Sequence, residues 1–259
     1  MPKASVNGIE LYYESHGEGP AIVFAHGAGG NHLSWFQQVP TFSRNYRCIT
    51  FDHRGWGASI ESNDGPGRSA FVEDLKQLLD YLEVERAYLV AQSMGGRTCL
   101  GFALAYPERT LGLVLGDTTG GVNDPALEEA QRGVAPPLDG LLRMLSANTI
   151  DQHPNRAFLY SQISGLNPPR ANSVASSEGP TGADLARQPV PTLLIVGEED
   201  LIAPVQVMRA LHRLIPGSRL AVVPGAAHST YFEQSAEFNR LVADFLTQIL
   251  AETATTAAD

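Results

Sequence analysis

The sequence is poor in several features that mark particular classes of protein. Only two of its 259 residues are cysteines, Cys48 and Cys99. We expect two buried, reduced thiols rather than a disulfide framework. The chain has no apolar run of about 18 residues, so we expect no membrane span. Residues 1–20 lack a charged start followed by an apolar core, so we expect no signal peptide and a cytoplasmic protein.

Positive charge and ligand motifs are also scarce. The chain has 18 Lys and Arg against 28 Asp and Glu, a net charge of -10, and such a surface repels phosphate backbones, which argues against nucleic-acid binding. The seven histidines are scattered. No H-E-x-x-H or Cys/His cluster occurs, and neither G-x-G-x-x-G nor Gly-Lys-Ser/Thr follows a strand. We therefore expect neither a metal nor a cofactor.

What the sequence does contain is an alternation of strand-like and helix-like segments. The expected strands are Ile9–His16, Ala21–Ala25, Arg47–Phe51, Ala87–Ala91, Leu111–Leu115, Thr192–Gly197 and Arg219–Val223. The expected helices are Trp35–Phe42, Ala70–Leu82, Ser93–Tyr106, Val205–Leu214 and Ser235–Leu250. This order predicts an α/β fold, with a mostly parallel, doubly wound sheet of about eight strands and helices on both faces.

The alternation stops between Asp117 and Pro191. Helical pieces over Ala126–Arg132, Leu138–Ala147 and Arg156–Ser164 are separated by Pro-Pro pairs and by the Ser/Gly/Pro-rich run Asn172–Gly182. Such stretches form joints between elements. We therefore expect a core of residues 1–117 and 191–250, an inserted helical cap of residues 118–190, and a disordered tail of residues 251–259.

A serine stands between one of the strands and its helix. In Ala91-Gln92-Ser93-Met94-Gly95, small residues two positions to either side of Ser93 suit a tight, strained turn that presents the hydroxyl at the edge of the sheet. The free N–H groups of the helix start, that of Met94 first, then face the same point. The alternative is an ordinary serine cap of a helix. The usual motif has glycine where Ala91 stands, so we expect a tighter turn.

A nucleophilic serine needs a base, and the base needs a carboxylate that orients it. His228 follows the last expected strand, and Asp200 follows the strand before it, behind Glu198 and Glu199. When a nucleophilic serine stands on such a strand-to-helix turn, called a nucleophile elbow, the three residues follow one another along the chain in the order serine, acid, histidine. Asp117, at another strand end, competes with Asp200 as the acid, as do the two glutamates, and His228 could instead be a solvated loop residue.

A glycine-rich loop, Ala25-His26-Gly27-Ala28-Gly29-Gly30, follows the second expected strand. Its glycines let backbone N–H groups approach a ligand closely. Because no phosphate-binding signature is present, we interpret it as an oxyanion-hole loop whose second donor is the N–H of Ala28. His26 is then expected to hold the loop by hydrogen bonds rather than to act as a base.

Taken together, these pieces resemble the α/β-hydrolase superfamily over about residues 3–117 and 190–250. The matching pieces are His26-Gly27, Asp52-x-Arg54-Gly55-x-Gly57-x-Ser59, Ser93-Met94-Gly95-Gly96, Gly197-x-x-Asp200 and Gly225-x-x-His228. The resemblance implies Ser93 as nucleophile, His228 as base, Asp200 as its orienting acid, and the amides of Ala28 and Met94 as oxyanion donors. Within the superfamily the chain looks like the small-capped esterases, enol-lactonases, C–C bond hydrolases and perhydrolases.

We therefore predict a serine hydrolase that acts on a small to medium carboxylic ester or lactone. The expected cap has few charged residues, which favours a largely apolar substrate group. Trp35, Leu201 and Ile202 are the candidate pocket residues. C–C bond hydrolysis and perhydrolysis on the same residues remain alternatives, as does a ligand-binding protein with incidental turnover. A haloalkane dehalogenase would need aspartate at the elbow. We expect a monomer or homodimer.

Overall fold

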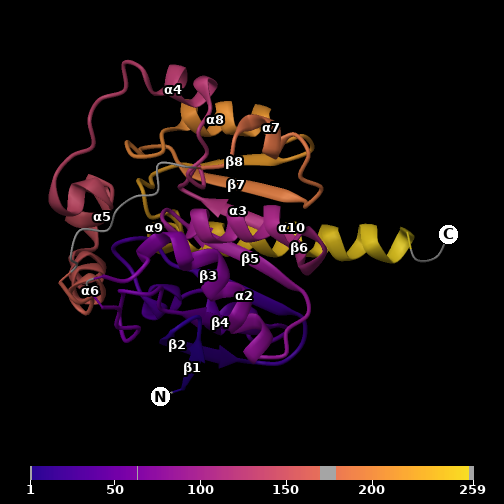
Figure 1. Cartoon of the computed structure of the whole chain (residues 1–259). Coiled ribbons are helices and arrows are strands. Elements are labelled where there is room, and N and C mark those ends of the chain that lie inside the picture. Colours follow the sequence, from indigo (N-terminus) through magenta and orange to yellow (C-terminus); the bar gives the residue numbers. More distant parts are fainter. Residues whose placement is uncertain (1, 63, 170–178, 257–259) are drawn as a thin grey trace.

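The computed structural model describes residues 2–62, 64–169 and 179–256. Within these residues one eight-stranded sheet runs through the molecule in the order β1-β2-β4-β3-β5-β6-β7-β8 (Figure 1). The strands are β1 (Lys3–Val6), β2 (Ile9–His16), β3 (Ala21–Ala25), β4 (Arg47–Phe51), β5 (Ala87–Gln92), β6 (Thr110–Gly116), β7 (Thr192–Gly197) and β8 (Arg219–Val223). The six strands from β4 to β8 in this order pair in parallel, which confirms the predicted fold class.

The first strand was not expected, and a tight hairpin explains it. β1 pairs antiparallel with β2, which in turn pairs antiparallel with β4. The turn between β1 and β2 is Asn7-Gly8, and both residues have positive φ, 44° and 77°. This is the backbone of the two-residue turns that suit the twist of a hairpin. The Asn-Gly pair therefore extends the sheet by one edge strand.

Helices cover both faces of the sheet. On one face α2 (Phe71–Tyr81), α3 (Gly95–Ala105) and α8 (Val205–Leu214) pack against the strands, and on the other α1 (Val39–Phe42) and the long α10 (Ser235–Thr256) do so (Figure 1). Successive side chains of a strand point to opposite faces, so each strand contributes to two cores. The doubly wound arrangement thus rests on apolar runs that are buried on both sides.

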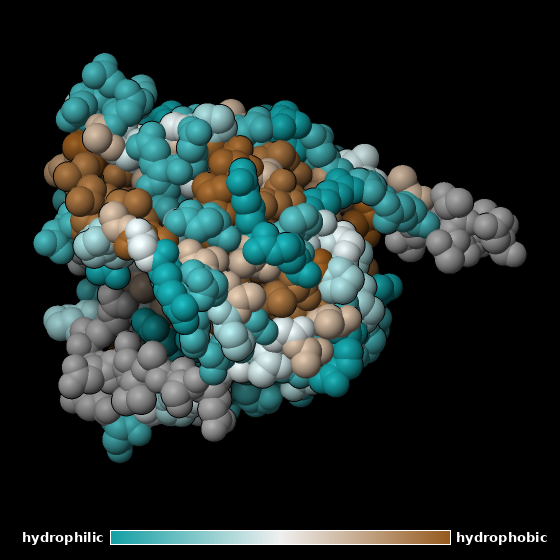
Figure 2. Space-filling model, turned by 90° about the horizontal axis from the view of Figure 1, so that it is seen from above, coloured by the Kyte–Doolittle hydropathy of each residue, from teal (hydrophilic) through white to brown (hydrophobic). Residues whose placement is uncertain are grey.

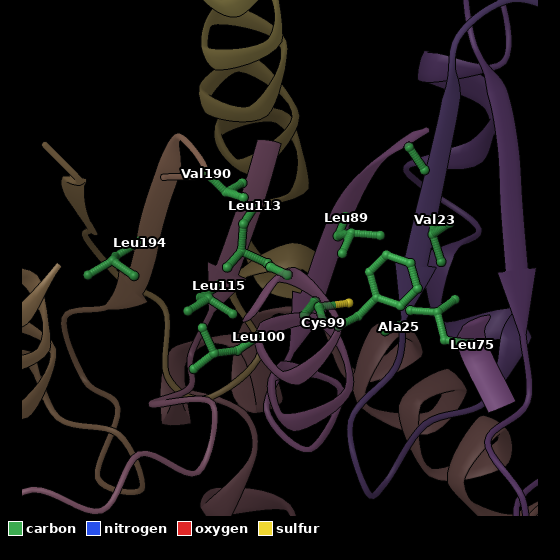
Figure 3. Close-up of a cluster of buried hydrophobic side chains, with 14 of the residues drawn as sticks. Val23, Ala25, Leu75, Leu89, Cys99, Leu100, Leu113, Leu115, Val190 and Leu194 are labelled. Carbon is green, nitrogen blue, oxygen red and sulfur yellow. The ribbon is translucent and has the colours of Figure 1, made fainter. Parts of the chain in front are cut away.

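The larger core lies between the sheet and α2, α3 and α8. Figure 3 shows the middle of it, where Cys99 and Leu100 of α3 meet Leu89 of β5 and Leu115 of β6. Cys99 is fully buried there. Cys48 is fully buried in the second core, which lies on the other face of the sheet, against α1 and α10. Both cysteines are free. Burial raises the pKa of the Cys48 thiol to about 12, so it is un-ionised at neutral pH.

Between β6 and β7, the described residues 117–169 and 179–191 contain helices and no strand. These are α4 (Pro125–Gln131), the 3-10 helix η4 (Gly140–Arg143), α5 (Ala147–Gln152), α6 (Pro154–Gly165) and α7 (Gly182–Leu185). α5 and α6 lie side by side beyond one end of the sheet (Figure 1). Most of the run Asn172–Gly182, expected as a joint, lies outside the described residues.

Two of the expected helices between residues 30 and 150 are divided. The expected helix Leu138–Ala147 is replaced by η4 and α5, because Ser146 caps α5 by accepting a hydrogen bond from the N–H of Thr149. Trp35–Phe42 is also not one helix but the 3-10 helix η1 (His32–Trp35), which the side chain of Asn31 caps, followed by α1, whose start has no side-chain cap. A capping side chain starts a helix by satisfying its free N–H groups, and it therefore also separates that helix from what precedes it.

The last helix extends further than its apolar pattern indicates. We expected it to end at Leu250 and a disordered tail to follow, but α10 continues to Thr256. Residues 251–256 contain two alanines and a glutamate, which have good helix propensity, beside three threonines. They add turns to a helix that is already nucleated, which costs less than starting one. The expected tail is therefore wrong for residues 251–256, while residues 257–259 lie outside the described part.

The surface carries apolar side chains in patches among hydrophilic ones (Figure 2). Exposed examples between β6 and β7 are Leu138, Leu142, Phe158 and Leu166. In the part of the chain that the structure describes, no helix combines the length and apolar character needed to cross a membrane.

Candidate active site

Ser93 stands at the turn between β5 and α3, as the sequence predicts. Its φ is 48°, in the left-handed region that a residue with a Cβ rarely adopts. The N–H of Ser93 donates to Gly116 O at 3.0 Å, which ties the turn to β6. Helix α3 begins two residues later, at Gly95. The backbone strain is thus held by the sheet on one side and by the helix on the other.

Small residues make this turn possible. A Cβ on Gly95 would lie 2.2 Å from the carbonyl oxygen of Ala25 on β3, so the helix start and the strand are already in contact. Ala91, where the common motif has glycine, is fully buried in the larger core together with Ala25 and Leu115. The methyl group of Ala91 therefore fills core space on the strand side of the turn.

This crowding predicts that Gly95→Ala destabilises the protein. The added methyl group meets backbone atoms of Ala25, which cannot rotate away, and we expect a loss of about 1–3 kcal/mol in the free energy of unfolding. Denaturant unfolding of the two proteins measures it. Gly165→Ala is the control, since an added Cβ at Gly165 meets no atom within 4 Å. Equal stability of the two variants would contradict the crowding.

Asp200 lies in the loop after β7 and is 2% exposed. Its Oδ1 accepts hydrogen bonds from the N–H groups of Ile202 and Ala203, at 2.7 and 3.0 Å. Its Oδ2 lies 2.9 Å from Nδ1 of His228. The loop backbone thus fixes one carboxylate oxygen and leaves the other for the histidine.

His228 follows β8 and links the acid to the serine. Its Nε2 lies 2.8 Å from Ser93 Oγ, on the opposite side of the ring from Asp200. The histidine is 2% exposed, and the amide of Gln92 donates to its carbonyl oxygen at 2.7 Å. The structure therefore brings together the three side chains that the sequence singled out, in one hydrogen-bonded series.

Burial and charge oppose each other at His228. Burial lowers the pKa of the imidazole, but the charge of Asp200 and the hydrogen bond to it raise that pKa, and Asp117 adds to the increase. The net result is a pKa above the usual 6.5. A base with this pKa takes up a proton readily at neutral pH.

The other acids considered for this role lie elsewhere. Glu198 and Glu199 are exposed, which suits ordinary surface residues. Asp117 is fully buried at the end of β6, but both of its carboxylate oxygens accept hydrogen bonds from Gly197 and Thr230 rather than from His228. The carboxylate in hydrogen-bond contact with the imidazole is that of Asp200.

The glycine-rich loop after β3 lies beside the serine turn. Ala28 packs against the cluster formed by Trp56, Phe71 and Met94, so the two expected donor residues belong to one local cluster. The indole N–H of Trp56 donates to Ala28 O at 2.9 Å and so fixes the loop. Among the residues described, no acceptor takes up the N–H of Ala28 or of Met94. Both amides are therefore available to an oxygen atom placed at the turn.

His26 contacts the backbone of this loop, as expected. Its Nδ1 lies 2.8 Å from Gly27 O, and its Nε2 accepts the N–H of His53 at 3.0 Å. His53 in turn contacts Thr98 Oγ1 of α3 through Nε2, at 2.8 Å. Burial, followed by the neighbouring His26, holds the pKa of His53 well below 6.5. The pair thus connects the loop, β4 and α3 through hydrogen bonds.

Two positioning contacts were not predicted from the sequence. A Cβ on Gly27 would meet Oε1 of Gln92 at 2.0 Å, so the Gln92 side chain lies between the glycine-rich loop and His228. Glu233 is buried and accepts the N–H groups of Ala227 and Ser146, at 2.8 and 2.7 Å. For Gln92, its position directly before Ser93 is the one feature of the sequence that could have indicated a role. The sequence around Glu233 contains no such feature.

The three residues expected to line the pocket differ in their burial. Trp35 is wrong as a pocket residue, because it has no exposed surface and its ring packs on Phe24, Tyr231 and Phe238 in the second core. Its large apolar ring is simply core. Leu201 and Ile202 are half-buried beside Asp200, and their role as pocket residues stays a prediction.

Side chains from the segment between β6 and β7 approach the loop instead. The nearest atoms to a Cβ on Gly29 would be Tyr160 Oη, Ser164 Oγ and Met144 Sδ, at 3.4, 3.9 and 4.0 Å. Ser229, next to His228, has its hydroxyl 3.3 Å from Tyr160 Oη. No group of three or more His, Cys, Asp or Glu side chains in the described ranges is arranged to hold a metal ion.

Comparison with known proteins identifies the family. Residues 20–143 match the alpha/beta hydrolase fold family, and residues 169–256 match a family described as TAP-like protein. A 2-hydroxy-6-oxononadienedioate/2-hydroxy-6-oxononatrienedioate hydrolase of Paraburkholderia xenovorans is 30% identical, over 92% of this chain and 91% of that protein. The chain therefore belongs to the α/β-hydrolase family, and it is a hydrolase.

Solved structures agree with this assignment. A thermophilic esterase from Thermogutta terrifontis superposes with a TM-score of 0.83 and is 28% identical, over 96% of this chain and 98% of the esterase. The enol-lactonase from Burkholderia xenovorans gives a TM-score of 0.80 at 26% identity, over 95% of this chain and 100% of the lactonase. Each likeness covers at least 95% of this chain.

Proposed function

We propose that this chain is a cofactor-independent serine hydrolase that cleaves a small to medium, largely apolar carboxylic ester or lactone through an acyl-enzyme. One observation carries the proposal. Ser93 Oγ, His228 and Asp200 form a single hydrogen-bonded series, with distances of 2.8 and 2.9 Å, at a strained strand-to-helix turn. This arrangement is what an activated serine nucleophile requires.

In the first half of the reaction, Ser93 Oγ attacks the carbonyl carbon while His228 Nε2 takes the hydroxyl proton. The tetrahedral intermediate then collapses, the C–O bond to the alcohol breaks, and Nε2 returns the proton to the departing oxygen. In the second half a water molecule attacks the acyl carbon while His228 Nε2 takes a proton from it. The bond to Ser93 Oγ then breaks, Nε2 returns the proton to Oγ, and the carboxylic acid leaves. Asp200 keeps the proton on Nδ1 and stabilises the imidazolium formed in each half.

We assign the oxyanion hole to the N–H groups of Ala28 and Met94. Their packing in one small cluster and the absence of another acceptor among the described residues support this role. Each such donor contributes ~3 kcal/mol to transition-state stabilisation. Because the donors are backbone groups held by Trp56 and by the start of α3, they need no reorganisation during the reaction.

The segment of residues 118–190 is proposed to act as a cap that forms much of the pocket wall. Met144 and Tyr160 of this segment approach the glycine-rich loop, and Leu145, Ala157 and Ile163 are buried against the second core. These side chains are apolar or aromatic, which supports a largely apolar acyl or alcohol group. Burial raises the pKa of the Tyr160 phenol to about 12, so that it presents a neutral hydroxyl.

The pKa of His228 predicts how activity depends on pH. The base must be neutral to accept the serine proton, and Asp200 holds its pKa above 6.5. Activity is therefore fully present above the folded-state pKa and is lost as the pH falls through it. We expect kcat/KM to fall about tenfold per pH unit on this acidic limb. A pH profile with a neutral ester measures it, and a limb centred well below pH 6.5 would contradict the assignment.

A substrate panel tests the proposed reaction. The names of the Thermogutta and Burkholderia proteins support an ester or lactone substrate. We expect turnover of p-nitrophenyl esters with short to medium acyl chains or of lactones, lost in Ser93→Ala. The proposal would be overturned if the wild type showed saturating kinetics neither with the esters nor with the lactones. The Ser93→Ala variant controls for contaminating esterases.

C–C bond hydrolysis is the second candidate. The relative from Paraburkholderia xenovorans is named as a hydrolase of 2-hydroxy-6-oxononadienedioate, which has no ester bond to cleave. The same serine, histidine and aspartate would serve that reaction. Vinylogous diketones therefore complete the panel, with hydrogen peroxide and a carboxylic acid as the test of perhydrolysis. A kcat/KM for a diketone above that for every ester and lactone would favour this second candidate.

A further inference from the structure

Asp117 is a fully buried carboxyl group that the proposed reaction leaves without a role. It follows β6, whereas Asp200 and His228 follow β7 and β8. Its φ is 52°, so its backbone, like that of Ser93, is left-handed. A non-glycine residue is held in this region only where its surroundings fix it, and such residues gather at functional sites.

The carboxylate of Asp117 joins the two loops that carry the acid and the histidine. Its Oδ1 accepts the N–H of Gly197 at 3.0 Å, at the end of β7 and three residues before Asp200. Its Oδ2 accepts the N–H and the hydroxyl of Thr230, at 3.0 and 2.7 Å, two residues after His228. Asp117, at the end of β6, thus fixes the distance between the loop that carries Asp200 and the loop that carries His228.

The two loops touch directly where Asp117 holds them. A Cβ on Gly197 would lie 2.1 Å from Ala227 O and 2.4 Å from Ala226 O. Glu199 N–H also donates to Ala226 O at 2.9 Å. A displacement of either loop would therefore break the hydrogen bonds of Asp117 and would change the contact between Asp200 and His228.

The charge of Asp117 also acts on the pair. Burial and, next, the charge of Asp200 raise the pKa of Asp117 to about 7, while His228 opposes that rise. In the other direction Asp117 raises the pKa of His228, and Arg143 lowers it. Among the described residues, the phenols of Tyr160 and Tyr231 also interact with Asp117, and burial raises the pKa of both, so they stay neutral.

We propose that Asp117 is a positioning residue that holds the Asp200 and His228 loops together and so keeps the imidazole in line between Asp200 and Ser93. The proposal rests on the proposed function of Ser93, His228 and Asp200. Asp117 is not the acid of the series, because its oxygens face Gly197 and Thr230. It acts on the reaction only through His228 and Asp200.

The test measures the pKa of His228 by NMR titration of the ring nitrogens in four proteins. Asp117→Asn removes the ionisable carboxyl group, and we expect the pKa of His228 to fall by up to about one unit, because a carboxyl group with a pKa of about 7 is only partly ionised where His228 titrates. Glu199→Gln removes one charge from the exposed neighbour of Asp200 and is expected to leave that pKa unchanged. Thr230→Val keeps the carboxyl group but removes one hydrogen bond that lowers the pKa of Asp117, so we expect a smaller fall in the pKa of His228 than in Asp117→Asn. His228→Gln assigns the signal.

Kinetics give the second readout. For Asp117→Asn we expect kcat to fall on the order of 10- to 100-fold with KM unchanged, because a displaced base misaligns the reacting atoms. The acidic limb of the pH profile moves to lower pH in step with the NMR value. If the amide variant does not fold, Asp117→Ser takes its place, since it also removes the charge and adds no bulk.

Three outcomes overturn the proposal. An unchanged or raised pKa of His228 in Asp117→Asn would exclude an effect of its charge. An equal fall in Glu199→Gln would show a general charge effect. A loss of kcat in Asp117→Asn as large as that in Ser93→Ala would make Asp117 part of the catalytic series. The NMR readout needs no substrate, so failure of the proposed function, seen as a wild-type protein inactive on the whole panel, is recognised separately.

Discussion

Replacing Ser93 by alanine is expected to lower ester turnover by ~10⁴-fold or more, with little change in stability. Ser93 Oγ is the atom that we expect to bond to the substrate, and nothing else on the described part of the turn can replace it. The residual rate reflects the oxyanion donors and the base acting on water. Steady-state kinetics on the best ester or lactone of the panel measure the loss.

Ser69→Ala is the matched control for this variant. Ser69 is an exposed serine whose hydroxyl donates to Pro66 O, away from the turn, and its loss is expected to leave kcat/KM unchanged. Near-normal activity of Ser93→Ala would contradict the mechanism, since a bound substrate would then react without the proposed nucleophile.

Asp200→Asn has the second largest expected effect, a fall in kcat on the order of 10³- to 10⁴-fold. The carboxylate accepts the proton on His228 Nδ1 and leaves Nε2 free to take the serine proton. An amide placed there can donate to Nδ1, which favours the tautomer with the proton on Nε2 and blocks the base. Loss of the negative charge also lowers the pKa of His228.

The control for Asp200→Asn is Glu198→Gln, because Glu198 is exposed in the same loop and contacts no part of the series. We expect its kcat to match the wild type. The result that would move the acid role elsewhere is a loss of 10³-fold or more in Asp117→Asn together with a mild effect of Asp200→Asn.

Much of the fold was readable from the sequence because its signals are local. The buried strands are short apolar runs, and the turn at Ser93 needs small neighbours at fixed spacing. The Asn7-Gly8 turn was equally local, since both residues adopt the positive φ that Asn and Gly tolerate. The strand before it, β1, is only four residues long, with polar residues on its exposed positions, so its strand pattern is weak.

The features that could not be predicted depend on packing between distant segments. Trp35 looked like a pocket residue and is core, because Phe24, Tyr231 and Phe238 enclose it from three other elements. The resemblance implied Asp200 as the acid, but the residues alone left Asp117 open, because the choice depends on which carboxylate reaches His228 Nδ1 across two loops. Glu233 shows the same limit, since it contacts Ser146, 87 positions away.

Covalent labelling tests most directly whether Ser93 is an activated nucleophile. A fluorophosphonate reacts with a serine only where a base and an oxyanion hole activate it. Intact-protein mass spectrometry followed by peptide mapping would show one adduct on Ser93 in the wild type, slower labelling in Asp200→Asn and none in Ser93→Ala. An unlabelled wild type, or an adduct at another serine, would contradict the account and favour a ligand-binding role for this fold.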